Sequence, residues 1–199
     1  MVSTSNSPRP DRATQWPRRG AFRLRCPIGV EQTLIEEYLR ARWQLIEEEL
    51  AGDDLRRIVE ADGELAGALA MARGSVEKSP PYLRSHSEGR WVLKTGTHLD
   101  PRLQRRYEPA KYEQLMDLVG PVFGIVTSRR LNLCGYAAVV ILSRHPEFSP
   151  ALGPAAFVQQ VEAGAIDEPL LSAHLRYGAQ VVALSSASKG AMAIVCRSS

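Results

Sequence analysis

The stretch AFVQQVEAGAIDEPLLSAHLRYGAQVVAL, residues 156–184, decides the fold of this chain. Apolar residues at helical spacing predict a first helix, and Gly164 can end it because glycine tolerates a positive φ. Leucines then recur with His174 every three to four residues until Gly178, after which AQVVAL has the pattern of a buried strand. The stretch therefore predicts a helix, a turn, a second helix and a strand.

The order of second helix, Gly178 and strand resembles the ending of GNAT-type N-acyltransferases, in which a fourth helix precedes a Gly-Phe element and a strand. More narrowly, GAIDEPLLSAHLRYGA (residues 164–179) is similar to GNAT-like domains associated with carbon-nitrogen hydrolases. The resemblance is clear over residues 144–197. It implies an α/β fold with a GNAT-like mixed central sheet of about six or seven strands and helices on both faces.

Length and composition indicate one globular domain. The chain has 199 residues, 44% of them hydrophobic and 24% charged, which is enough to bury a core without disulfides. No apolar run approaches the roughly 18 residues of a membrane span, and the N-terminus lacks the apolar part of a secretory signal, so a cytoplasmic location is expected. Three scattered cysteines and widely spaced histidines predict neither a disulfide framework nor a metal site.

Positive charge gathers at the N-terminus. Residues 1–25 hold six arginines and one acidic residue, a net charge of +5, whereas the rest of the chain carries −2. Residues 1–20 are therefore predicted to be a disordered basic tail, and residues 21–199 a single GNAT-like domain. Two interpretations of the tail stay open: a solvated extension, or a contact with an acidic partner such as a carrier protein, a tRNA or the phosphates of CoA.

Two features of the first half also match the opening of a GNAT domain. Residues 30–50 repeat apolar side chains at helical spacing, which predicts a long amphipathic helix. Asp62-Gly63 between two runs of strand-forming residues predicts a hairpin. Further along, WVLKTGT (residues 91–97) predicts a strand, and the basic, proline-bounded residues 100–111 predict a loop or a broken helix.

AAVVIL, residues 137–142, is the most apolar strand candidate of the chain. A continuous apolar run is typical of a strand that is buried on both faces. It is therefore predicted to be central in the sheet and parallel to a neighbour.

VGPVFGIV, residues 119–126, is the candidate segment for binding CoA phosphates. GNAT enzymes bind the pyrophosphate with a Q/R-x-x-G-x-G/A loop between a strand and a helix, where glycines admit backbone N–H groups and the helix N-terminus adds partial positive charge. The resemblance implies that the following residues hold an acyl-CoA or carrier-protein phosphopantetheine co-substrate: Val119, Gly120, Phe123, Gly124, Ile125, Arg129 and Arg130.

This segment departs from the family pattern. No Arg or Gln leads it, its two glycines are four residues apart, and Pro121 removes one backbone donor. A plain turn followed by a helix cap is the alternative interpretation of the two glycines.

The resemblance also suggests catalytic residues. In the family, a Tyr four residues before the glycine protonates the departing thiolate; here His174 occupies that position and Tyr177 adjoins Gly178. A histidine can donate a proton at neutral pH, but a core histidine with a hydrogen-bonded ring is the alternative. The candidates for the general base are Glu60, Glu113, Asp117 and Glu147, each with a plain surface charge as the alternative.

Three functions follow from the resemblance. The first is direct transfer of an acyl group from an acyl-CoA or acyl carrier protein thioester to an amine of a small molecule, with no covalent enzyme intermediate. The second uses an aminoacyl-tRNA as the donor, and the third is a GNAT-like protein that binds its ligand without catalysis. An edge strand predicted at residues 191–197 would let two copies pair as a homodimer.

Overall fold

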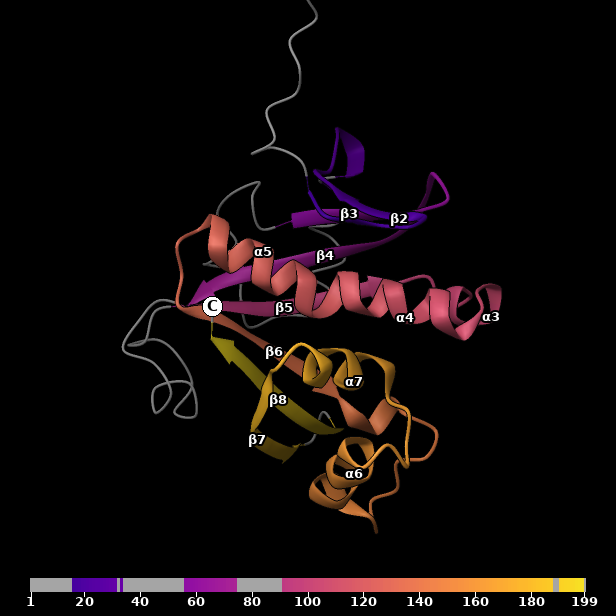
Figure 1. Cartoon of the computed structure of the whole chain (residues 1–199), viewed down its shortest axis with the longest axis vertical. Coiled ribbons are helices and arrows are strands. Elements are labelled where there is room, and N and C mark those ends of the chain that lie inside the picture. The colour runs from indigo at the N-terminus through magenta and orange to yellow at the C-terminus, as the bar shows by residue number, and fades with distance from the viewer. Residues whose placement is uncertain (1–15, 32, 34–55, 75–90, 188–189, 199) are drawn as a thin grey trace, which may run out of the picture.

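The computed structural model describes residues 16–31, 33, 56–74, 91–187 and 190–198. Its strands form one eight-stranded sheet in the order β1-β2-β3-β4-β5-β6-β8-β7 (Figure 1). The strands are β1 (Arg18–Arg19), β2 (Phe22–Arg25), β3 (Arg56–Ala61), β4 (Glu64–Gly74), β5 (Trp91–Leu99), β6 (Gly135–Ile141), β7 (Gln180–Ala187) and β8 (Gly190–Ser198). The helical elements are α3 (Leu103–Arg106), α4 (Pro109–Asp117), η3 (Leu118–Val122), α5 (Phe123–Arg130), η4 (Leu142–Arg144), α6 (Gly153–Glu162) and α7 (Pro169–Arg176).

The sheet is mixed, as predicted. Neighbouring strands are antiparallel except β5 and β6, which are parallel and are joined by the helical segment from α3 through α5. Such a crossover is required because parallel strands cannot be linked by a tight turn. The prediction that AAVVIL forms a central strand parallel to a neighbour is confirmed by β6. The described sheet has eight strands rather than six or seven, since β1 and β2 are short and too rich in arginine to be predicted from apolar pattern.

The C-terminal order of helix, turn, helix and strand is confirmed by α6, α7 and β7. Helix α7 packs against α4, η3 and α6, so these helices share one face of the sheet (Figure 1). The long helix predicted over residues 30–50 lies, beyond its first residues, outside the part of the chain that the structure describes.

The predicted hairpin at Asp62-Gly63 joins β3 to β4. Both turn residues have positive φ, 52° at Asp62 and 85° at Gly63. This geometry matches the right-handed twist of the two strands and favours Asp-Gly, so the sequence prediction and its physical reason are both confirmed.

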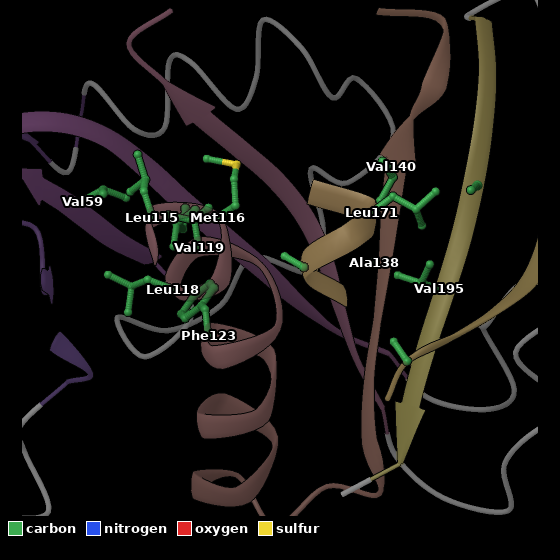
Figure 2. Close-up of a cluster of buried hydrophobic side chains, with 14 of the residues drawn as sticks. Val59, Leu115, Met116, Leu118, Val119, Phe123, Ala138, Val140, Leu171 and Val195 are labelled. Carbon is green, nitrogen blue, oxygen red and sulfur yellow. The ribbon is translucent and has the colours of Figure 1, made fainter. Parts of the chain in front are cut away.

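The core lies between the α4–η3–α5 segment, α7 and the sheet (Figure 2). Buried side chains labelled in the figure are Val59, Leu115, Met116, Leu118, Val119, Phe123, Ala138, Val140, Leu171 and Val195. Full burial of each large apolar side chain contributes about 1.5–3 kcal/mol. The glycine-bearing segment predicted to bind phosphates is thus part of the main core.

The N-terminal boundary of the domain differs from the prediction. The ring of Trp16 lies 3.6 Å from the guanidinium carbon of Arg57 and 5.9 Å from the ring of Phe123, and β1 pairs with β2. Residues 16–20, predicted to be part of a disordered tail, therefore belong to the fold, because a tryptophan can anchor an otherwise polar segment. Residues 1–15 lie outside the described chain.

The edge strand is also corrected. Residues 191–197 form most of β8, which lies between β6 and β7 and is paired on both sides. The ends of the described sheet are β1 and β7. Among the described helices, none is both long and apolar enough to cross a membrane.

Candidate functional site

The parallel strands β5 and β6 separate half-way along their length. They pair from Trp91 opposite Gly135 to Lys94 opposite Ala138, and then β5 continues beside β4 while β6 continues beside β8. Figure 2 shows the two strands close together at one end and diverging toward the other. Backbone groups of β5 beyond Lys94 that face β6 therefore have no partner in a described strand.

A β-bulge lies at the point of separation. The register between β4 and β5 passes from Ala70 opposite Gly96 to Met71 opposite Lys94, which leaves Thr95 as an extra residue in β5. A bulge bends its strand and re-aims the adjoining backbone groups. It turns β5 away from β6 where the parallel ladder ends.

The start of α7 lies between the segments that follow the two diverging strands. On one side, Nε2 of His145, just beyond β6, is 3.1 Å from the carbonyl oxygen of Asp167. On the other side, Tyr112 in α4 lies close enough to Glu168 for that carboxylate to act on its hydroxyl: burial first, and then the Glu168 charge, raise the pKa of Tyr112. Glu168 therefore lies at the open end of the strand pair.

Glu168 is a partly buried carboxylate that caps α7. Its Oε2 accepts a hydrogen bond from the backbone N–H of Leu171. Burial raises the pKa of Glu168, and this effect outweighs the lowering by the N–H groups of Leu171 and Leu170 and by His145. Glu168 was not among the predicted residues, because a glutamate before a helix has the pattern of a solvated charge. Its place directly before Pro169, the first residue of α7, was the available signal.

The predicted phosphate loop is helical. η3 forms a single π-helical turn that joins α4 to α5, with a kink at Gly120 (φ −91°, ψ −106°). Gly120 and Gly124 are both buried. A Cβ on Gly124 would lie 2.5 Å from Cγ of Tyr136, and one on Gly120 would lie 3.0 Å from Cδ1 of Leu170. These glycines permit close packing of the helix on β6 and α7. The structure therefore agrees better with the interpretation in which the glycines bind no ligand than with a phosphate-binding loop.

The remaining residues of that prediction do not gather around an open loop. Val119 and Phe123 are buried in the core, and Ile125 packs against it. Arg129 and Arg130 lie at the far end of α5, where the chain returns to the paired end of β6. The α4–η3–α5 part of the segment alone spans roughly 30 Å at 1.5 Å per residue, so these arginines are far from the diverging ends.

His174 is a fully buried residue of α7. Its Nδ1 lies 2.9 Å from the hydroxyl oxygen of Tyr136 on β6, and its Nε2 faces Gly120. Burial raises the pKa of the Tyr136 hydroxyl, which stays neutral at physiological pH. This environment matches the core histidine that was the alternative to a proton donor.

Asp117 and Tyr177 do come together. The Tyr177 hydroxyl donates to Oδ2 of Asp117 at 3.4 Å, and Arg176 donates to Oδ1 at 2.8 Å. Arg19 contacts both Asp117 and Tyr177. Burial and the Asp117 charge raise the pKa of Tyr177. The cluster joins β1, α4 and α7 as an ion-pair network that already engages both oxygens of the carboxylate.

The other predicted bases lie elsewhere. Glu113 is exposed on α4, and Glu147 is exposed beyond η4. Glu60 on β3 accepts hydrogen bonds from Arg23 and Arg25, each with a 2.5 Å separation. Burial alone would raise the pKa of Glu60, but these two arginines outweigh it and lower the pKa. Within the described residues, no group of three His, Cys, Asp or Glu side chains could hold a metal ion.

The segment that directly follows the diverging strand β5 is residues 100–111. A loop and a broken helix were the two predictions for this segment, and the structure shows the broken helix: α3 ends at Arg106 and α4 starts at Pro109. Arg102 pairs with Asp100 and Arg106 with Glu64, while Arg105 is exposed.

A pocket of about 300 Å³ lies beside this segment. Its lining includes the two ion pairs together with Leu65 and Leu103. Residues 100–111 therefore lie directly between the separating strand β5 and the rest of the helical crossover. The predicted strand at residues 91–97 was the signal that could have located it.

No protein-family model matches the sequence, and no curated protein matches it. Solved structures with a similar fold include the loading GNATL domain of CurA from Lyngbya majuscula, with 18% identity, a TM-score of 0.47, and 90% of this chain and 98% of that one covered. FeeM, an N-acyl amino acid synthase from uncultured soil microbes, has 8% identity and a TM-score of 0.48, with 89% and 90% covered. The putative acetyltransferase yncA from Salmonella typhimurium, solved with acetyl-CoA, has 12% identity and a TM-score of 0.45, with 90% and 94% covered.

TM-scores below 0.5 at these identities are too low to assign an activity or a substrate. The fold is defined by the topology of this chain itself. A parallel strand pair separates, a helical crossover joins its two strands, and a helix, a glycine and a strand follow near the C-terminus. The fold is GNAT-like, as the C-terminal stretch predicted.

Proposed function

We propose that this protein transfers an acyl group from a thioester donor to an amine of a small molecule. The observation that carries the proposal is the separation of β5 and β6 beyond Lys94 and Ala138, with a bulge at Thr95. Backbone N–H groups at such a place can bind the thioester arm and stabilise the oxyanion that forms when the amine attacks. The reaction is direct, because the nucleophile is the substrate amine.

The donor's phosphates would lie near residues 100–111. This segment follows the diverging end of β5 and presents Arg102, Arg105 and Arg106 toward solvent. Guanidinium groups suit phosphate because they offer several donors in a fixed plane. His174 supports this site by holding α7 against β6 through Tyr136.

The test is a transfer assay with the purified full-length chain. Acyl-CoA thioesters of several chain lengths are incubated with a panel of primary amines, and amide products and free thiol are measured together by mass spectrometry and by a thiol reagent. We expect one class of thioester to give amide and thiol in equal amounts. Thiol release without amide would identify a thioesterase, and neither product, with no binding of any thioester, would contradict the proposal.

A carrier-protein thioester is a second candidate donor. It is favoured by the lack of glycine in residues 100–108 and by the exposure of Arg102 and Arg105, which suit a protein surface better than a buried pyrophosphate. We expect such a donor to react faster than the matching acyl-CoA, with a preference that falls as ionic strength rises. Equal rates at all salt concentrations would favour the CoA donor.

A further inference from the structure

Glu168 stands out among the described carboxylates by its position. The predicted bases Glu60 and Asp117 are engaged by arginines, whereas Glu113 and Glu147 are exposed on the surface. Glu168 is partly buried, contacts a backbone N–H, and lies at the open end of the two separating strands. It is therefore placed where an amine acceptor would meet a thioester held by β5 and β6.

We infer that Glu168 is the general base that removes a proton from the acceptor amine, a role that rests on the proposed function. The carboxylate is held by the start of α7, between Tyr112 of α4 and His145 beyond β6. Oε2 of Glu168 accepts the Leu171 N–H, which holds the carboxylate at the N-terminal end of α7.

The chemistry balances as follows. Glu168 takes one proton from the ammonium form of the acceptor, and the neutral nitrogen attacks the thioester carbonyl carbon. The C–N bond forms and the C–S bond breaks, with the sulfur leaving as a thiolate. A second proton passes from the nitrogen to the thiolate, and the proton on Glu168 goes to solvent. The products are an amide, a thiol and one proton.

The surroundings of Glu168 suit this role. The titratable and charged groups that face it are Tyr112 from α4, His145 from the segment after η4, and Asp167 on its own segment. Burial dominates, disfavours the ionised form and raises the pKa of Glu168, so its carboxylate takes up a proton more readily than an exposed one would. The alternative is a purely structural role, in which Glu168 only caps α7 by accepting the Leu171 N–H.

Two substitutions separate the two roles. Glu168→Gln keeps an oxygen that can accept the Leu171 N–H but removes the base, and Glu168→Asp keeps both a cap and a carboxylate but retracts the latter by one methylene. We expect amide formation by Glu168→Gln to fall about 100-fold or more, with donor binding and the thermal unfolding midpoint close to those of the wild type. For Glu168→Asp we expect roughly a tenfold loss. Glu147→Gln, an exposed carboxylate near His145, is the matched control and should keep the full rate.

The pH dependence of the transfer rate distinguishes the two roles, because a residue that only caps α7 would not change it. In the wild type the transfer rate should rise with pH as Glu168 ionises and then reach a plateau. In Glu168→Gln this step should vanish, leaving a rate that follows hydroxide concentration across the range. A Glu168→Gln variant with the wild-type rate and profile overturns the role of Glu168 while leaving the proposed function intact. Equal losses in Glu168→Gln and Glu168→Asp, accompanied by a lower unfolding midpoint, overturn it in favour of a cap. A wild-type protein that acylates no amine overturns both proposals.

Discussion

Two segments of the same helical crossover show opposite relations between sequence and position. Residues 118–124 carry the glycines expected of a phosphate loop, yet they are buried against Tyr136 and α7. Residues 100–108 carry no glycine, yet they follow the strand that separates from its parallel neighbour. Glycine spacing alone therefore does not identify a phosphate site. The phosphate site proposed above is placed instead by the strand immediately before the segment.

The largest expected effect is at Gly124. In Gly124→Ala, the new Cβ would lie 2.5–2.7 Å from three atoms of the Tyr136 ring, closer than packed carbons can approach. Helix α5 and β6 must shift apart, and the free energy of unfolding should fall by about 1–3 kcal/mol or more. Urea denaturation measures the loss, and Gly124→Ala combined with Tyr136→Leu should recover part of it. A fully stable Gly124→Ala protein would contradict the packing role and restore the loop interpretation.

Local pattern predicted most of the fold. The hairpin at Asp62-Gly63, the strand β6 and the C-terminal helices depend on turn chemistry and on side-chain periodicity within a few residues. The two short strands at the N-terminus were not predicted, because their position depends on Trp16. This residue packs on Arg57 and Phe123, which are distant from it in the sequence.

The site was predicted less well than the fold, for a physical reason. The separation of β5 from β6 is a property of register between strands some 40 residues apart, and no local pattern encodes it. Gly120 and Gly124 have the same sequence signature whether they admit a phosphate or a tyrosine ring. Asp117 and Tyr177 were separate candidates, and their contact was not predicted because the arginines that join them come from β1 and the end of α7.

The next effect concerns the hydrogen bond beneath the glycine segment. Tyr136→Phe removes the hydroxyl that lies 2.9 Å from Nδ1 of His174 and leaves that buried ring nitrogen without this partner. We expect the free energy of unfolding to fall by about 1–3 kcal/mol. Tyr112→Phe is the control, because the Tyr112 hydroxyl makes no hydrogen bond to a described residue in this structure, and it should change stability by less. Equal losses from both substitutions would show that ring packing, not the contact with His174, is responsible.

Gly120 should tolerate a methyl group better than Gly124. The Cβ of Gly120→Ala would lie 3.0 Å from Cδ1 of Leu170, the end of a flexible side chain, and 3.4 Å from Nε2 of His174. Leu170 can yield by a change of rotamer, so we expect a loss below about 1 kcal/mol in the same urea assay. A loss as large as that of Gly124→Ala would mean that the kink between α4 and α5 cannot shift at all.

The smallest effect distinguishes the two ends of the helical crossover as sites for the donor. Arg105→Gln, at the diverging end, should weaken binding of the thioester donor by up to about 1 kcal/mol, roughly fivefold, because an exposed charge pair contributes little in water. The weakening should shrink at high salt. Arg129→Gln, an exposed arginine at the opposite end, is the matched control and should leave donor binding unchanged. Both variants should keep the wild-type unfolding midpoint, because neither side chain is buried. Calorimetric titration with the donor at two salt concentrations decides between the segments: if Arg129→Gln weakens binding and Arg105→Gln does not, the donor's phosphates lie at the α5 end of the crossover, as the glycine pattern first predicted.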